Sequence, residues 1–247
     1  MRIDVITLFP DFIRTAADIG VVGRAKARGL IEIATWNPRD FALDNYRSAD
    51  ERPYGGGPGM VMKVEPVRSA LRDALRVLPA GSLRVYLGAD GRKFEQRMAR
   101  EACSWPGLAL VAGRYEGIDE RFIEQEVDEQ WSIGDYVLSG GELPALVVID
   151  AIARLMPGTL GSMDSALQES FSDGLVDWPH YTRPQALDGH EVPAVLASGD
   201  HAAVQRWRLQ QALGRTWLRR PELLEQRGMS DAERELLEEF KNEARQR

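Results

Sequence analysis

Glycine clusters are the feature of this 247-residue chain best suited to chemistry. Three of them end short apolar runs: "YLGADG" (86–91), "VAGRYEG" (111–117) and "SIGDYVLSGGELP" (132–144). A fourth, "RPYGGGPGM" (52–60), puts four glycines and two prolines into nine positions. Glycine accepts a positive φ and lets another molecule approach the main chain closely. Since ligands of open α/β sheets gather at the carboxyl ends of the strands, we predict a ligand held there by main-chain groups.

The missing motifs narrow the class of this ligand. No G-x-G-x-x-G follows the first expected strand, and no G-x-x-x-x-G-K-[ST] occurs anywhere. The first strand instead ends in "LFPDF" (8–12), which cannot cradle a pyrophosphate. The single Cys103 excludes an internal disulfide, and three scattered histidines have no metal-ligand spacing. These patterns favour a ligand such as an adenosine without a polyphosphate.

The charge distribution is uneven. The net charge is −7, yet residues 201–221 contain no Asp or Glu, and Trp207 and Trp217 lie among the arginines. The tail, 222–247, has eight acidic residues against five basic ones. Two interpretations stay open, a surface for a polyanion and a solvated helix with its tryptophans in the core. The arginines of this segment are Arg206, Arg208, Arg215, Arg219 and Arg220.

Strand-like and helix-like runs alternate over the first two thirds of the chain, which predicts a mainly parallel sheet covered on both faces. One helical pattern runs from Val64 to Leu78, with Pro66 near its start and Pro79 beyond its end, and another covers 143–156. The strand-like runs are β-branched or aromatic and end in turn signals. They are 3–9, 30–36, 83–88, 108–113 and 131–138.

Two domains are expected. We predict an α/β domain over 1–160, a linker over 161–174 and a helical domain over 175–247. The last would hold helices at about 201–214, 221–227 and 230–245, and no good strand. No apolar run reaches transmembrane length, and "MRIDVITLFP" lacks a signal peptide's apolar core, so we expect a cytoplasmic protein.

Six motifs together resemble one family, the bacterial tRNA (guanine-N1)-methyltransferases. Members of that family use S-adenosylmethionine to methylate the guanosine at tRNA position 37, next to the anticodon. The resemblance runs nearly end to end, with the motifs in family order and spacing. They are "WNPRDF" (36–41), "RPYGGGPGM" (52–60), "GRYEGIDER" (113–121), "WSIGDYVLSGGELPA" (131–145), "PHYTRP" (179–184) and "RTWLRRPELL" (215–224).

The resemblance implies a fold that the spacing of residues could not show. Family members belong to the SPOUT superfamily, whose parallel α/β sheet ends in a deep trefoil knot, here followed by the small helical domain. The resemblance also implies an obligatory homodimer, with an active site completed across it. The helical domain of one subunit would grip the tRNA. Neither DNA nor a membrane is an expected partner.

The resemblance also implies a cofactor pocket in the knot loops. One departure from the family lies at "LGADG" (87–91), where Gly88 replaces the usual serine. Gly88 would remove any contribution of that side chain to the affinity for the cofactor. The positions that match the family's cofactor pocket are Tyr86, Leu87, Gly113, Glu116, Ser132, Ile133, Gly134, Asp135, Tyr136, Val137, Leu138, Gly140, Gly141 and Pro144.

The substrate's chemistry defines what catalysis needs. Guanine N1 carries a proton at neutral pH, so a base must remove it, and the charge that moves to O6 needs a cation. The positions that match the family are Glu169 as the general base and Arg154 as the cation, since arginine stays charged. Glu169 is a second departure, because the family usually has Asp there. Both are carboxylates, but Glu is one methylene longer.

The remaining implied residues concern tRNA and a metal. Some family members need a divalent cation, and Glu116 and Glu169 could supply oxygen ligands for Mg²⁺. The glycine-rich loop would lie beside the substrate guanosine. Positions matched to tRNA contacts are Gly55, Gly56, Gly57, Gly59, Asp177, His180, Tyr181, Arg183, Arg208, Arg215, Arg219 and Arg220.

Two other functions stay open from the sequence. One is a related SPOUT enzyme with a different RNA target, which the position of the methyl group in the product would reveal. The other is a non-catalytic RNA-binding protein, which Glu169 makes conceivable and which would bind both substrates without turnover.

Overall fold

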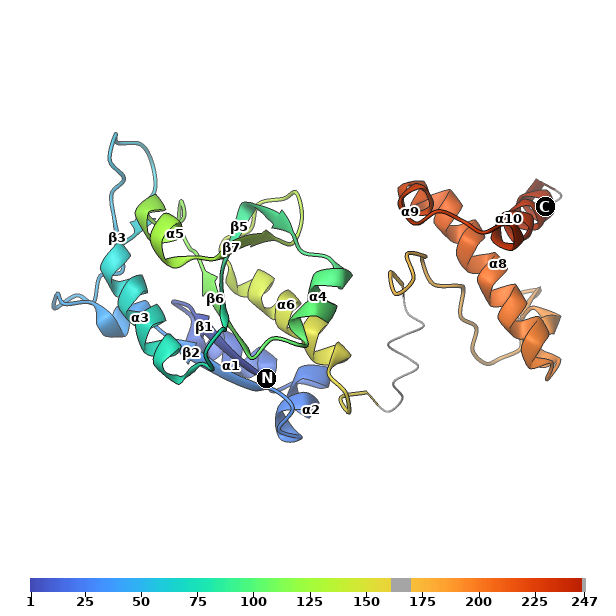
Figure 1. The fold of residues 1–247 in the computed structure, drawn as a ribbon, viewed down its shortest axis with the longest axis horizontal. Coiled ribbons are helices and arrows are strands. Elements are labelled where there is room, and N and C mark those ends of the chain that lie inside the picture. Colours follow the sequence, from blue (N-terminus) through green and yellow to red (C-terminus); the bar gives the residue numbers. More distant parts are fainter. Residues whose placement is uncertain (161–169, 246–247) are drawn as a thin grey trace. The chain divides into compact units, whose positions relative to one another are not determined.

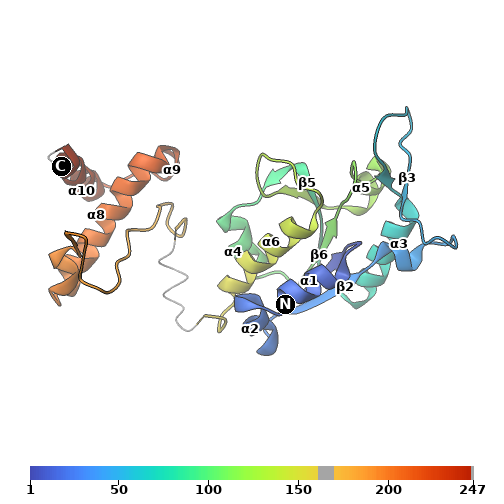
Figure 2. The same cartoon turned by 180° about the vertical axis from the view of Figure 1, so that it is seen from behind.

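A computed structural model describes residues 1–160 and 170–245 of the chain. The chain divides into two compact units, Met1–Met163 and Asp164–Arg247, each with a hydrophobic core of its own (Figures 1 and 2). Of the linker predicted at 161–174, residues 161–169 lie outside the described part.

The first unit is built on a five-stranded sheet in the order β2-β1-β6-β5-β7. Every neighbouring pair in it is parallel, which confirms the predicted parallel sheet. The strands are β1 (Arg2–Ile6), β2 (Glu32–Trp36), β5 (Leu83–Lys93), β6 (Gly107–Ala112) and β7 (Glu129–Ser132).

Both faces of this sheet are covered (Figure 1). Successive strand residues point to opposite faces. On β6, Leu108 and Leu110 therefore join one core cluster, and Ala109 and Val111 join the other. The first cluster includes residues of α1 (Pro10–Ala17), α2 (Gly20–Ala27), α4 (Gln96–Ala102) and α6 (Glu142–Leu155), and the second includes residues of α3 (Val64–Val77) and α5 (Glu120–Glu126).

Prolines set the ends of the two predicted helices. Helix α3 ends at Val77 because Leu78, before Pro79, takes an extended ψ of 144°. Helix α6 ends at Leu155 in the same way, since Met156 has a ψ of 125° and precedes Pro157. The residue before a proline disfavours the α conformation. Both helices agree with their predicted bounds to within one residue.

The last strand was predicted too far along the chain. It was expected over 131–138, but β7 covers only Glu129–Ser132. Gly134 has a φ of 150°, and the segment beyond Ser132 turns away from the sheet as a loop. The alternating pattern of "WSIGDYVL" therefore belongs partly to a loop, and the glycine within it is the signal of the break.

A short antiparallel hairpin carries the glycine-rich loop. It pairs β3 (Asp50–Glu51) with β4 (Val61–Met62) and follows the 3-10 helix η1 (Pro38–Phe41). Residues 52–60 form its tip, where Gly55, Gly56, Gly57 and Gly59 all have a positive φ.

The second unit is mainly helical. It contains α8 (His201–Arg219), α9 (Pro221–Arg227) and α10 (Asp231–Arg245), around a core that includes Leu213 and Leu237. It also contains η2 (Ala194–Ala197). The backbones of α8 and α10 approach closely at Gly214, where a Cβ would overlap the ring of Phe240.

The expectation of no strand in this unit was wrong in a small way. Strands β8 (Ala186–Leu187) and β9 (His190–Glu191) form an antiparallel hairpin. Its turn residues, Asp188 and Gly189, have φ values of 52° and 79°. Asp-Gly is a preferred sequence for two-residue hairpin turns, so the signal was present in "ALDGHE".

Within the described residues, no helix is both long and apolar enough to cross a membrane.

Candidate active site

A pocket of about 280 Å³ opens at the carboxyl ends of β6 and β7 and beside residues 86–89 in the middle of β5, where the register with β7 shifts. Every residue predicted for the cofactor lines it except Asp135, whose exposed side chain lies 3.9 Å from Lys93. The lining also includes Gly88, the departure from the family noted in the sequence, and residues of the same motifs to which the sequence assigned no role: Ala89, Arg114, Tyr115, Gly117 and Trp131.

Glycines let the loops around this pocket lie directly on one another. Gly141 donates its N–H to the carbonyl of Gly113 at 2.8 Å, and Arg114 forms an antiparallel bridge with Gly140. A Cβ on Gly141 would lie 2.6 Å from the Cα of Ala112. The pocket wall is therefore main chain packed on main chain, which no larger residue would allow.

Tyr86 and Asp90 occupy the space that a side chain at position 88 would need. A Cβ at this position would lie 2.7 Å from the ring of Tyr86 and 2.8 Å from a carboxylate oxygen of Asp90. Burial, with smaller contributions from Asp90 and Glu120, raises the pKa of Tyr86, so its phenol stays neutral. A serine at position 88 would require Tyr86 or Asp90 to move.

A buried carboxylate stands behind the pocket. Glu142, 1% exposed at the start of α6, accepts hydrogen bonds from the Thr7 hydroxyl and from Nε of Arg114, both at 2.8 Å. Arg114 also donates to the Ser139 carbonyl at 3.1 Å, and its guanidinium lies 4.3 Å from the Phe9 ring centroid. These contacts join the ends of β1 and β6 to the loop before α6.

The glycine-rich hairpin reaches the pocket at Glu116. The N–H of Glu116 donates to the Met60 carbonyl at 3.0 Å. The Glu116 side chain lies over Gly59, where a Cβ would be 2.6 Å from its Cγ and 2.8 Å from its carboxyl carbon. A second hollow, of about 560 Å³, is lined by the hairpin residues Arg52, Pro53, Gly56, Gly57, Gly59 and Met60.

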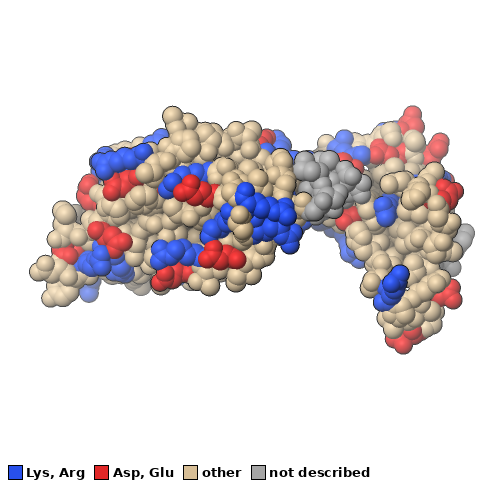
Figure 3. Space-filling view, turned by 90° about the horizontal axis from the view of Figure 1, so that it is seen from below, with Lys and Arg blue, Asp and Glu red and all other residues tan. Residues whose placement is uncertain are grey.

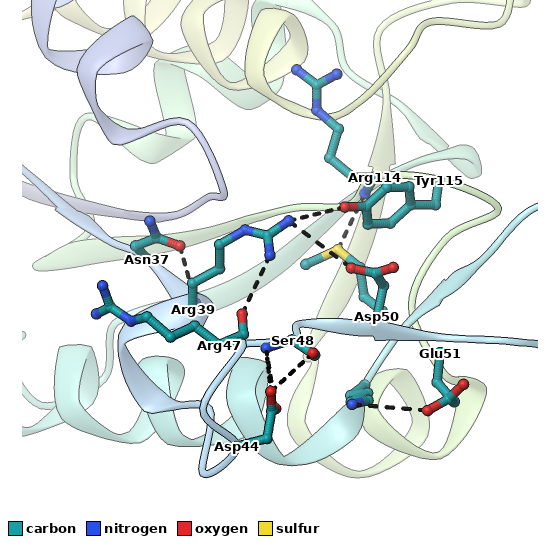
Figure 4. A network of polar contacts seen from close by, with 11 residues as sticks. Asn37, Arg39, Asp44, Arg47, Ser48, Asp50, Glu51, Arg114 and Tyr115 are labelled. Atoms are coloured by element: carbon teal, nitrogen blue, oxygen red, sulfur yellow. Dashed lines mark hydrogen bonds and ion pairs between the residues drawn. The ribbon is translucent and has the colours of Figure 1, made fainter.

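A polar network lies beside Tyr115 (Figure 4). The Arg39 guanidinium donates to the Tyr115 hydroxyl at 3.2 Å and to the Arg47 carbonyl at 3.3 Å, and it lies 4.0 Å from Asp50. Burial and Asp50 raise the pKa of Tyr115. Sequence reasoning did not assign these residues a role, although Arg39 and Tyr115 lie in the quoted motifs "WNPRDF" and "GRYEGIDER".

The two predicted catalytic residues are not both at this pocket. Arg154 lies in the last turn of α6, and Pro144, which lines the pocket, lies in the first. Ten residues of helix separate them by about 15 Å along the axis. Glu169 lies outside the described residues. Within the described ranges, no group of three or more His, Cys, Asp or Glu side chains could hold a metal ion.

The helical unit brings several predicted tRNA residues together. Asp177 and Nε2 of His180 are 2.9 Å apart, and Trp178 packs beside His180 with ring centroids 5.7 Å apart. The Arg208 guanidinium lies 5.0 Å from the Trp178 ring centroid. Tyr181 packs beside Trp207.

The arginines of this unit differ in what they contact. Arg206 pairs with Glu239 of α10 at 2.6 Å, and Arg220 pairs with Glu222. The acidic tail thus neutralises part of the basic segment. On the face of the helical unit seen in Figure 3, blue atoms are few and stand apart among tan ones. Arg183 and Arg219 are exposed, while Nε of both Arg208 and Arg215 is buried without a hydrogen-bond partner among the described residues.

Comparison with known proteins identifies the family of this chain. Residues 1–226 match the family model of the tRNA (guanine-1)-methyltransferase TrmD. The chain is 59% identical to the tRNA (guanine-N(1)-)-methyltransferase of Methylococcus capsulatus, over 98% of this chain and 97% of that one. It is 58% identical to the protein of the same name from Shewanella amazonensis, with the same coverage of both chains. This chain belongs to the tRNA (guanine-1)-methyltransferase family.

Proposed function

We propose that this methyltransferase uses S-adenosylmethionine as its donor and that its target is the guanosine at tRNA position 37, next to the anticodon. Methyl transfer to N1 of a tRNA guanine is the activity of the family to which the chain belongs. The observation that carries the proposal is the pocket at the strand ends, lined by all but one of the residues that match the family's cofactor site.

The chemistry of the lining suits this donor. Main-chain groups of glycine loops can read the edge of an adenine, and the neutral Tyr86 phenol and the apolar Trp131 and Pro144 suit an uncharged nucleoside. The Glu116 carboxylate at one side suits a sulfonium cation. S-Adenosylmethionine supplies an electrophilic methyl group when bound. The protein's part is to hold the donor and to expose guanine N1 to it.

Arg154 and Glu169 are proposed to act on the guanine. Glu169 accepts the N1 proton, and Arg154 stabilises the negative charge that moves to O6. Because Arg154 lies about 15 Å along α6 from Pro144, we propose that it serves the pocket of a second subunit.

An exposed apolar face supports this homodimer. Helices α1 and α6 contact each other, and Phe12, Leu143 and Val147 on them are 46–48% exposed. Positions 143, 147 and 154 share one face of a helix. If α6 packs against its own copy across a two-fold axis that is perpendicular to the helix, the two helices run antiparallel, and Arg154 of one subunit then lies toward the pocket end of the other.

The remaining fold and binding proposals follow the family. The trefoil knot is proposed for the loops after β5, β6 and β7, and the contact of Gly141 with Gly113 supports it. The proposed domains are 1–160 and 175–247, with the linker 161–174 between them, and the second domain holds the tRNA. For Mg²⁺, Glu116 offers one ligand; the described residues offer no group of three, so no step is assigned to the metal.

A single-turnover methyl transfer tests the proposal. The protein is mixed with labelled S-adenosylmethionine and an unmodified tRNA that carries guanosine at position 37, and the methylated nucleoside is identified by mass after digestion. N1-methylguanosine at that position is the expected product. A methyl group at another nucleotide would refute the proposed target, and binding of both substrates without transfer would show that Glu169 does not serve as the base.

A further inference from the structure

We propose that Tyr46 and Tyr54 stack on unpaired tRNA bases that flank the target guanine. Tyr46 lies on a loop that Arg39 joins to Tyr115, and Tyr54 lies in the hairpin tip, whose Met60 carbonyl accepts the N–H of Glu116. Tyr115 and Glu116 are neighbouring residues of the pocket. The proposal rests on the proposed function only in placing the donor in that pocket.

Both side chains are almost fully exposed. Tyr46 is 90% exposed and Tyr54 is 99% exposed. A single exposed apolar residue is common on protein surfaces. Here, however, an aromatic ring projects from each of the two loops that reach the same side of the pocket.

The loop of Tyr46 is built by side-chain hydrogen bonds. The carboxylate of Asp44 accepts the N–H of Tyr46 at 2.9 Å. It also accepts the N–H of Ser48 at 3.1 Å and the Ser48 hydroxyl at 3.0 Å (Figure 4). Arg47 is held with a φ of 55°, and its side chain pairs with Asp40 at 2.5 Å. A ring presented by an ordered loop loses little conformational entropy on binding.

Arg39 ties this loop to the pocket. Its backbone N–H donates to the Asn37 side chain at 3.0 Å, which caps η1. Its guanidinium reaches both the carbonyl of Arg47 and the hydroxyl of Tyr115 (Figure 4). The position of Tyr46 is therefore set relative to the pocket wall.

The loop of Tyr54 is shaped by glycines. Gly55, Gly56 and Gly57 have φ values of 85°, 76° and 110°, and a Cβ on any of them would meet nothing within 4 Å. These glycines therefore serve the backbone conformation and leave the tip uncrowded.

The reaction requires unpaired bases here. N1 lies on the Watson–Crick edge of guanine, so the target must be unpaired before it can be methylated, and its neighbours lose a stacking partner when it leaves the stack. Proteins that bind single-stranded RNA replace such contacts with aromatic rings, and every base has a π-face that can take part. Unpaired RNA is thus the partner that fits two exposed tyrosines at this place.

The test compares substitutions in the full chain. Tyr46→Ala and Tyr54→Ala should each weaken tRNA binding and raise the KM for tRNA by about tenfold, the effect expected for one lost base–aromatic stack. The affinity for S-adenosylmethionine, measured by calorimetry, should not change. Tyr→Phe at either position should restore binding. Leu43→Ala is the matched control, because Leu43 is 100% exposed near Tyr46 but cannot stack.

A fluorescence measurement gives a direct signature of stacking. With 2-aminopurine on either side of the target guanosine, binding to the unsubstituted protein should quench the probe, and the double Tyr→Ala variant should not quench it. Unchanged tRNA affinity and quenching in that variant, or an equal loss in Leu43→Ala, would overturn the proposal. Loss of donor binding by the unsubstituted protein would instead count against the proposed function.

Discussion

The proposed donor pocket and the proposed RNA-contacting surfaces are built in opposite ways. Around the pocket, Gly113 and Gly141 lie main chain on main chain, and the buried Glu142 holds Arg114. The hairpin tip and the loop of Tyr46 instead present exposed side chains, and the helical unit presents Arg219. We therefore expect substitutions in the first kind of region to disturb the fold, and substitutions in the second to lower only the affinity for RNA.

Glu142→Ala should have the largest effect. It leaves the Arg114 guanidinium without its buried partner, and breaking such a pair costs about 3–5 kcal/mol. Urea unfolding would measure the loss of stability, and calorimetry the loss of donor affinity. Glu142→Gln, which keeps the shape, should cost less. If the unsubstituted protein, Glu142→Ala and Glu142→Gln were equally stable, the fold would not depend on the pocket residues.

Arg154→Ala should lower kcat by about 100- to 1000-fold, the usual effect of removing one group that stabilises developing charge. The donor affinity should stay the same, because Arg154 lies far along α6 from Pro144 of its own chain. Single-turnover rates measure the first effect, and calorimetry the second. A heterodimer of Arg154→Ala with a pocket-defective Gly141→Val chain should keep one working site if the site is shared between subunits. No activity in any mixture of the two chains would contradict that arrangement.

Acid should loosen the helical unit by titrating Glu233. Arg227 and Ser230 lower the pKa of Glu233 to about 2, from an ordinary value of 4.5. Because the folded pKa lies below the unfolded one, the stabilisation is present above about pH 4.5 and is lost as the pH falls toward 2. It amounts to at most about 3 kcal/mol. Hydrogen exchange of α8 and α10 amides, corrected for intrinsic rates, should show this loss, and Glu233→Gln should remove the pH dependence.

Arg219→Ala should have the smallest effect. Arg219 is exposed at the end of α8, and if it contacts a phosphate its loss should weaken tRNA binding and reduce the salt slope by about one. Arg206→Ala is the comparison, because Arg206 already pairs with Glu239. Tyr46→Ala should leave the salt slope unchanged, since stacking releases no counterions. Equal salt slopes for all of these proteins would show that Arg219 makes no phosphate contact.

Much of the lining of the pocket was predictable from the sequence because its residues occur in contiguous motifs. Tyr86 to Leu87 and Ser132 to Leu138 are continuous stretches of the chain. A strand-like stretch followed by glycines indicates where a strand ends and a ligand loop begins. The strand prediction for 131–138 was wrong because it followed the apolar alternation past Gly134, whose φ of 150° lies in the loop that leaves the sheet. The Asp-Gly turn between β8 and β9, by contrast, is a local sequence signal of a hairpin.

The sequence by itself determined the parallel α/β character of the first unit, the helices ended by Pro79 and Pro157, and the glycine motifs that resemble the methyltransferase family. These features depend on neighbours in the chain, whose conformations are limited by local sterics. Only the tertiary structure decided that Glu142 is buried against Thr7, 135 positions away, that Arg39 anchors Tyr115, and that Arg154 lies at the far end of α6 from the pocket. Such contacts arise when distant segments share one sheet edge, and no local pattern specifies which side chains then meet.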